Sequence, residues 1–369
     1  MGYLSHVVRR GLDTSSTMDM VKRAVSEGPK IQVANWGLAL LATTFIVFIV
    51  CQVLVSYMLT DVVATLAMVE TPSAAITVSA LEDRGPNAKT DAKDGLLETG
   101  PEITLVHQKP ITSSIRGTIR HLVQHAGKWS RFRAFGYALI YSIANLVVVS
   151  ILSNLFRWVP GHRVFVPAIA GVICAPLHVA WTHKIISMPS DASWWSRVAH
   201  RSYYKNLALP AAVESSAGYL SLYVTEVFAI ILGLKDIPKE DHSKYTTGQG
   251  FSILGRSVSV LAILVACYLF LCLPAHVTLV RVEASILPDE HDTIVPFDRT
   301  FDGKVVPRVL GGSGAVGFLD AWKSFNWEAR RRIVKLFVKS TLILGGMFLI
   351  FAHIYLAEAL IVLSYTSHV

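Results

Sequence analysis

Long runs of apolar residues, separated by shorter polar segments, dominate the pattern of the chain. A helix rises about 1.5 Å per residue, so a run of about 20 residues crosses a hydrocarbon core of about 30 Å. Six runs approach or exceed this length, at about residues 36–59, 135–156, 164–186, 207–232, 251–280 and 333–363. The pattern predicts an all-α membrane protein with about six transmembrane helices.

The polar segments predict loops with short surface helices. Residues 1–33 form a polar, basic N-terminal segment. Residues 81–110 are rich in Gly, Pro, Lys, Asp and Glu, which is typical of a solvent-exposed loop. We expect short helices at the membrane surface at residues 115–125, 190–205 and 315–325. The loops after the first, third and fifth spans are basic, so the positive-inside tendency predicts that they face the cytosol or an organelle matrix.

Composition supports the membrane interpretation. Hydrophobic residues make up 52% of the chain and charged residues only 16%, against about 25% charged in typical soluble domains. The net charge of +8 is expected to contact anionic lipid headgroups, and we expect no nucleic-acid partner. The first 30 residues lack the apolar stretch of a secretory signal. The four cysteines lie inside apolar runs and predict no disulfide framework: Cys51, Cys174, Cys267 and Cys272.

A short motif occurs twice, near the ends of the third and fifth spans. The first copy runs Cys-Ala-Pro-Leu-His-Val from Cys174, and the second runs Cys-Leu-Pro-Ala-His-Val from Cys272, 98 residues later. In the same register His183 corresponds to Arg281. The repeat predicts three related units, each made of a span, a loop with a surface helix, and a second span. Their bounds are residues 34–158, 159–234 and 235–369.

This organisation resembles the mitochondrial carrier family, whose signature P-x-[D/E]-x-x-[K/R] ends each odd-numbered span. Pro176 and Pro274 match the proline of that signature, while His178 and His276 stand where the family has an acid. The resemblance implies a six-span solute carrier of a mitochondrial membrane. In that family, acids and bases at the span ends pair and close a cavity. Two histidines can supply such pairing only with partner acids, so either the gate differs or transport has been lost.

The motif itself allows three interpretations. Each Cys and His are four residues apart and share a helical face, so Cys174, His178, Cys272 and His276 are a candidate Cys₂His₂ metal set. In a structural interpretation, proline kinks each helix, cysteine packs as a small apolar residue and histidine bonds a freed carbonyl. In the third interpretation the histidines bind substrate, because ionisable residues inside a membrane are functional candidates by default.

Further candidates follow from the same rule. Glu214 and Glu226 lie within the fourth predicted span, and Glu358 lies with His353 in the sixth. The predicted substrate-binding residues are therefore His178, His276, Arg281, Glu214 and Glu226. The sequence contains no nucleophile elbow, P-loop, zinc-protease motif or dinucleotide fingerprint, so we expect neither an enzyme nor a cofactor.

The combined expectation is a carrier-like transporter of a small anionic solute, most naturally in a mitochondrial membrane, with another organelle membrane as the alternative. A second hypothesis is a carrier-like protein that no longer transports and serves as a scaffold or subunit of a membrane complex. Saturable flux in vesicles would separate the first from the second.

Overall fold

The computed structural model describes residues 35–71, 74–79, 102–107, 109–191, 193, 197–198, 201–235, 246–306 and 310–366. The predicted N-terminal segment, residues 1–33, lies outside this part of the chain. Contacts divide the protein into two compact units. One consists of residues 1–53 with 345–369, and the other of residues 54–344.

Within the described residues, five helices are long and apolar enough to cross a membrane: Asn35–Val69, Lys128–Leu155, His162–Ile186, Gly248–Ser285 and Trp327–Tyr365. They lie at five of the six predicted spans. Asn35–Val69 continues past the predicted end at residue 59, and Gly248–Ser285 continues past the predicted end at residue 280. In four of them the apolar side chains are largely exposed, as expected for helices that face hydrocarbon, whereas half of the apolar stretch of His162–Ile186 is buried inside the protein. These features identify an integral membrane protein built on helices.

The fourth predicted span differs from the others. Helix α8 (Tyr204–Ile231) occupies this position and is 28 residues long, but it is not among the five sufficiently apolar helices. Glu214 and Glu226, together with several serines, interrupt its apolar sequence. Six spans in three related pairs therefore stay a prediction.

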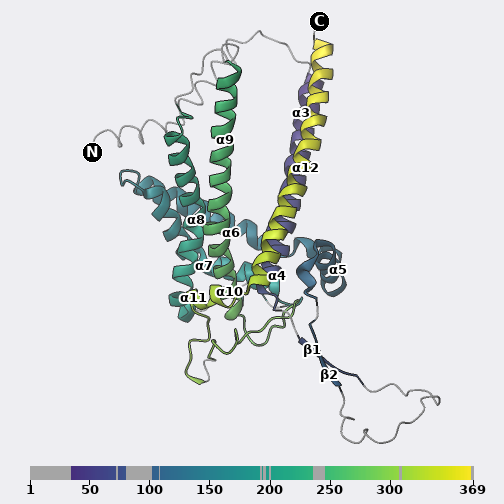
Figure 1. Cartoon of the computed structure of the whole chain (residues 1–369), viewed down its shortest axis with the longest axis vertical. Helices are drawn as coiled ribbons and strands as arrows, with labels where there is room; N and C mark the ends of the chain where they lie inside the picture. The colour runs from purple at the N-terminus through teal and green to yellow at the C-terminus, as the bar shows by residue number, and fades with distance from the viewer. Residues whose placement is uncertain are drawn as a thin grey trace, which may run out of the picture. The chain divides into compact units, whose positions relative to one another are not determined.

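Two of the other described helices continue through a π-helical segment. Helix α3 (Asn35–Ser56) continues through a π-helical segment, η1 (Tyr57–Val63), into α4 (Ala64–Val69). Helix α9 (Thr247–Cys267) likewise continues through a second π-helical segment, η7 (Tyr268–Cys272), into α10 (Leu273–Ser285). The others are η2 (Ile111–Ser113), α5 (Ile115–Ala126), η3 (Lys128–Phe132), α6 (Phe135–Leu155), α7 (His162–Ile186), η5 (Arg201–Tyr203), α11 (Phe318–Lys323) and α12 (Trp327–Thr366) (Figure 1).

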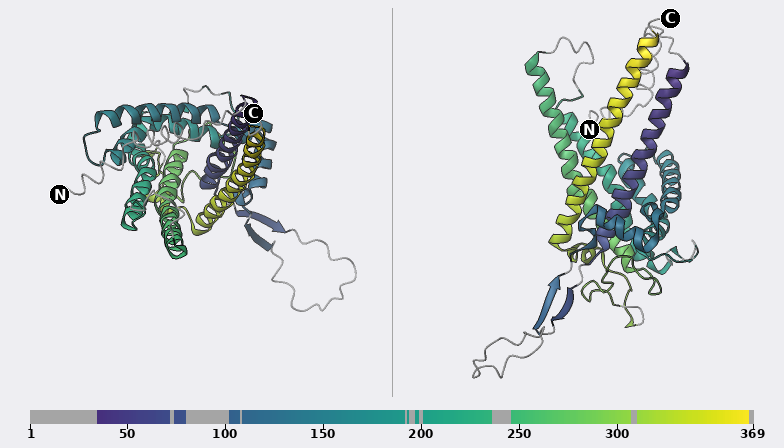
Figure 2. Two further views of the ribbon diagram at one scale, coloured as in Figure 1. Left: turned by 90° about the horizontal axis from the view of Figure 1, so that it is seen from above. Right: turned by 90° about the vertical axis from the view of Figure 1, so that its right-hand side faces the viewer.

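Residues 102–107 of the predicted loop at 81–110 form a strand, while residues 81–101 lie outside the described part of the chain. Strand β1 (Ala74–Ser79) pairs antiparallel with β2 (Glu102–His107), with Ala74 opposite His107 and Ser79 opposite Glu102. Figure 2 shows the two strands side by side. Both segments contain Ile, Val and Thr, which favour extended backbone. Of the predicted surface helices, α5 lies at 115–125 and α11 within 315–325. In the segment 190–205, residues 192, 194–196 and 199–200 lie outside the described residues, and η5 (Arg201–Tyr203) and the start of α8 occupy its end.

The smaller unit is an antiparallel pair formed by parts of α3 and α12 (Figure 1). The rings of Trp36 and Tyr365 lie 5.6 Å apart, and those of Phe48 and Phe351 lie 5.2 Å apart. Between these contacts, the Thr44 hydroxyl donates a 2.9 Å hydrogen bond to Glu358 Oε1. The predicted acid of the sixth span is therefore held by the opposite helix, while His353 bonds only the carbonyl of its own helix at Leu349.

The larger unit has its core where α4, α7 and α10 meet. Fully buried side chains there include Leu66 and Met68 of α4, Ile185 and Ile186 of α7, and Val280 of α10. Helix α7 also packs closely against α8, because a Cβ on Gly171 would lie 2.1 Å from Ser215 Oγ and 2.7 Å from the carbonyl oxygen of Ala211. This packing places the polar side chains of α7, α8 and α10 inside the unit.

Candidate functional site: a histidine and carboxylate cluster

Glu283 of α10 is the centre of a polar cluster inside the helices of the larger unit. Its side chain is fully buried, and one carboxylate oxygen lies 2.7 Å from Nδ1 of His178 on α7. The Thr182 hydroxyl, one turn further along α7, donates a 2.5 Å hydrogen bond to the other oxygen. Both oxygens therefore have partners, which a buried carboxylate requires because its charge has lost contact with water.

A third side chain of α7 reaches the same residue. His183 Nε2 lies 2.8 Å from the main-chain oxygen of Glu283, and since a carbonyl can only accept, this nitrogen carries the proton. Arg281, which corresponds to His183 in the repeat, also donates to main-chain carbonyls, those of Met68 and Ala321. His183 and Arg281, at the same position in the two copies of the motif, thus both donate hydrogen bonds to main-chain carbonyls of other segments.

A second histidine and carboxylate pair joins α10 to α8. His276 Nδ1 lies 3.4 Å from Glu214 Oε1, and each side chain is about a quarter exposed. Ser215 contributes a 3.4 Å hydrogen bond to the other oxygen of Glu214. Because His276 and Glu283 are seven residues apart, they lie on one face of α10, two turns from each other. On that face, Glu283 contacts α7 and His276 contacts α8.

Asp61 completes the cluster from a different helix. It lies in the π-helical segment η1 and interacts electrostatically with both His276 and His178. The Thr60 hydroxyl donates a 3.1 Å hydrogen bond to its carboxylate. Single π-helical turns inside α-helices are frequent at functional sites, because the extra residue shifts side chains out of the regular register. Three carboxylates and two imidazoles thus gather inside the helices.

Aromatic rings enclose the buried pair. The Tyr141 ring of α6 meets His178 edge-on with 4.9 Å between centroids, and Trp181 meets it at 5.1 Å. Trp181 also donates a hydrogen bond of 3.2 Å to the Tyr57 hydroxyl. These rings shield one side of the imidazole, which strengthens its interaction with Glu283 by lowering the local dielectric constant.

The candidate Cys₂His₂ set, one of the three interpretations of the motif, is not assembled. Among the residues that the structure describes, no group of three or more His, Cys, Asp and Glu could hold a metal ion. Cys174 is buried, and Cys272 Sγ lies 3.2 Å from the Ser221 hydroxyl. The structural interpretation is also wrong for the histidines, because His178 and His276 face carboxylates and not freed carbonyls.

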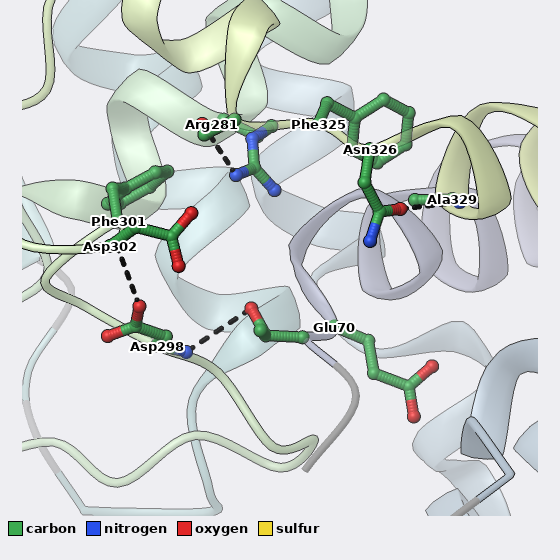
Figure 3. A pocket seen from close by; sticks show the side chains of 10 residues that line it. Glu70, Arg281, Asp298, Phe301, Asp302, Phe325, Asn326 and Ala329 are labelled. Atoms are coloured by element: carbon green, nitrogen blue, oxygen red, sulfur yellow. Dashed lines mark hydrogen bonds between the residues drawn. The ribbon is translucent and has the colours of Figure 1, made fainter. Parts of the chain in front are cut away.

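Arg281 lies apart from the histidines. It is two residues from Glu283, which places it about 200° around α10, on the opposite face. It donates to the main-chain oxygens of Ala321 (2.9 Å) and Met68 (3.1 Å) and to the Ser324 hydroxyl (3.0 Å). Figure 3 shows its guanidinium between the rings of Phe301 and Phe325, with centroid distances of 4.8 and 5.3 Å. Arg281 therefore ties α10 to α4 and α11.

A small cavity of about 40 Å³ lies beside Arg281 (Figure 3). Asp298 lines it and organises the loop that follows, accepting hydrogen bonds from Thr300 N–H (2.9 Å), the Thr300 hydroxyl (2.7 Å) and Asp302 N–H (3.0 Å). Burial by itself raises the pKa of Asp298, but these hydrogen bonds outweigh it and hold the pKa below the usual value. The Asp298 carboxylate is thus occupied by its own loop.

Glu226, the remaining predicted site residue, lies at the surface. Its carboxylate pairs with Lys235 at 3.1 Å, and both side chains are 42% exposed. Of the five predicted residues, the structure therefore brings together His178, His276 and Glu214, and places Arg281 and Glu226 elsewhere.

Two acids of the cluster, Glu283 and Asp61, are not among the residues predicted from the sequence. Glu283 lies three residues beyond the predicted end of the fifth span at residue 280, and Asp61 follows the predicted end of the first span at residue 59. The seven-residue spacing from His276 to Glu283 was a usable signal, since it places both residues on one helical face.

No protein-family model, no curated protein and no solved structure matches this chain. The resemblance to mitochondrial carriers therefore stays a prediction from the sequence.

Proposed function

We propose that the protein is a membrane transporter of a small anionic solute, and that its transport step depends on proton binding by the histidine and carboxylate cluster. The observation that supports the proposal is the pairing of His178 with Glu283 and of His276 with Glu214 between three helices. Chains of His, Asp and Glu inside membrane helices mark proton relays in pumps and transporters, because a buried charge without such a role is costly.

The pairs supply a physical means of coupling. Each holds two helices together, α7 to α10 and α10 to α8, and each is strongest when the imidazole is charged and the carboxylate is ionised. Protonation of Glu214 or Glu283 removes that attraction and frees one helix from the other. Helices that separate and rejoin in this way can open a path alternately to the two sides of a membrane.

The proposed solute is an anion because basic residues are frequent in the loops, and a positive surface raises the local concentration of anions. The resemblance to mitochondrial carriers favours a mitochondrial membrane as the location. Fractionation of cells that express a tagged chain tests the location separately from transport.

Purified protein in sealed liposomes tests the function directly. Uptake of radiolabelled small carboxylates and of phosphate would be measured with and without an inward proton gradient. We expect saturable uptake of at least one of these anions, faster with the gradient, and loss of the gradient effect in Glu214→Gln. Glu226→Gln is the matched control, because the two acids share α8 but Glu226 pairs with Lys235 at the surface. Uptake no greater than in protein-free liposomes would overturn the proposal.

A second candidate, a subunit of a membrane complex, is favoured by one surface of α9. Gly248, Ser252, Gly255 and Ser259 recur at intervals of three or four residues and are all exposed. Small residues in this spacing let membrane helices approach closely. Co-purification of a stoichiometric protein partner that is lost in Gly255→Leu, combined with no flux, would favour this candidate.

A further inference from the structure

Three cationic side chains converge at the C-terminal end of α7, outside the histidine and carboxylate cluster. Arg133 follows η3 and precedes α6, Lys184 lies in the last turn of α7, and Arg197 comes from the segment after α7. Lys184 interacts electrostatically with both guanidinium groups. The three charges are therefore close enough to repel one another.

The described acceptors of the two guanidinium groups are all neutral. Arg133 donates to the main-chain oxygen of Lys184 at 3.1 Å and also to that of Ser187. Arg197 donates to the hydroxyl oxygens of Ser187 at 3.0 Å and of Ser190 at 2.6 Å. Both arginines thus meet at Ser187, yet neither has a carboxylate among these partners.

Part of their hydrogen-bonding capacity is unused. Among the residues that the structure describes, Arg133 Nη1 and Arg197 Nε are buried with no hydrogen-bond partner, and Arg197 is only 2% exposed. Within the described part of the chain, the Lys184 ammonium has no hydrogen bond or ion pair, and Asp191, the acid that interacts with it, is exposed. Buried donors without acceptors are rare in folded proteins and costly, so each requires an explanation.

The end of the helix cannot balance these charges. The carbonyls at a helix C-terminus carry about half a negative charge together. Three cations oppose this half charge and the single exposed carboxylate of Asp191. A net positive charge therefore remains at the C-terminal end of α7, beside N–H donors that have no acceptor among the described residues. A bound anion would neutralise the charge and accept hydrogen bonds from these donors.

We propose that Arg133, Lys184 and Arg197 form a binding site for a phosphate-type anion. Guanidinium groups match phosphate oxygens in geometry, and the lysine adds a point charge. The site lies at the ends of two apolar helices, where lipid headgroups are found, so the phosphate belongs either to a phospholipid or to a free ion. This inference does not depend on the proposed transport activity.

Thermal unfolding of the purified protein in nanodiscs tests the site and separates the two sources. In phosphatidylcholine nanodiscs, inorganic phosphate would be compared with chloride at equal ionic strength. In a second arm, nanodiscs containing phosphatidic acid would be compared with phosphatidylcholine nanodiscs without added phosphate. A rise in Tm in the first arm assigns the site to a free anion, and a rise only in the second assigns it to a lipid headgroup. No rise in either arm overturns the proposal.

Lys184→Gln is the decisive variant, because it removes a charge without removing a hydrogen bond to any described residue. We expect its apparent affinity for the effective phosphate species to fall at least about tenfold, since a charge-assisted hydrogen bond is lost. Lys128→Gln is the matched control, an exposed lysine of η3 with the same change in charge, and it should retain the wild-type affinity. Equal affinity of the Lys184→Gln variant and the wild type would refute the assignment, as would equal losses in the two variants.

Discussion

Glu283 Oε1 lies 2.7 Å from His178 Nδ1, and this contact joins α10 to α7 within two helices that are apolar enough to cross a membrane. The sequence analysis found that histidines at the carrier-like positions need partner acids, and Glu283 and Glu214 are such acids. The pairing places a histidine and carboxylate contact inside helices whose sequences are mostly apolar. Its consequences can be measured in stability as well as in transport.

Replacing one member of the buried pair is expected to be severe. Glu283→Ala leaves His178, Thr182 and their donors without an acceptor, which costs about 3–5 kcal/mol in comparable buried pairs. Glu226→Ala, which breaks a pair of half-exposed side chains, should cost less than about 1 kcal/mol. Reversible unfolding of the two variants in mixed micelles provides the comparison, and similar losses would show that the His178 contact contributes little.

Arg281 is expected to resist replacement by lysine. An ammonium group cannot reproduce the fork that reaches Ala321, Met68 and Ser324, so at least one charge-assisted hydrogen bond is lost at about 1.5–3 kcal/mol. Arg331→Lys, at an exposed position of α12, should change stability by no more than about 0.5 kcal/mol. Equal stability of the two variants would contradict the role of Arg281 as a tie between segments.

Gly171 is expected to be required for the contact between α7 and α8. A methyl group there meets the carbonyl oxygen of Ala211 at 2.7 Å, and main chain cannot yield as a side chain can. Gly171→Ala should therefore destabilise the protein by about 1–3 kcal/mol. In Gly218→Ala the new methyl group meets nothing within 4 Å, so the gain in helix propensity should leave stability unchanged or raise it by up to about 1 kcal/mol. Unfolding midpoints of the two alanine variants test this difference in sign.

Asp298 predicts an acid-sensitive loop outside the membrane helices. Its pKa in the folded protein is below the usual value of 3.8, so the carboxylate stabilises the loop above that pH. The contribution is lost as the pH falls below about 3.8 and through the lower folded value. Hydrogen exchange of the Asp302 amide, corrected for its intrinsic rate, should thus be constant from pH 7 to about pH 4 and rise below it. Asp298→Asn should raise this exchange already at neutral pH, and unchanged protection in that variant would contradict the prediction.

The length of the apolar runs is the feature of the sequence that predicted most of the fold. Runs of 20 or more apolar residues located five membrane helices, because few other structures use such a sequence. The histidines were found by the same logic, as ionisable groups in an apolar setting. Their partners were not found, because Glu283 and Asp61 lie just beyond predicted span ends that were drawn at the loss of apolar character. Helices α10 and η1 continue past those points, since their polar side chains pair within the protein.

Other features were not accessible to an analysis of periodicity. The strand Glu102–His107 pairs with a strand more than 20 residues away, and local periodicity does not reveal such a distant partner. The polar residues around it are typical of a loop. The position of Arg281 depends on carbonyls of Met68 and Ala321, which no side-chain pattern encodes. The distinction between Glu214 and Glu226, twelve residues apart on one helix, arises from which helix or loop each one faces.

The π-helical segments η1 and η7 have a consequence for how this chain tolerates insertion and deletion. Each accommodates one residue more than an α-helix of the same rise, and one residue corresponds to a rotation of about 100°. Deleting one residue within Tyr57–Val63 would let the segment close into regular α-helix of nearly the same rise, so Leu66 and Met68 would keep their place in the core. Asp61 would lose the wide turn that positions it, so at this point the length of the chain sets the position of an acid and not the packing of the core.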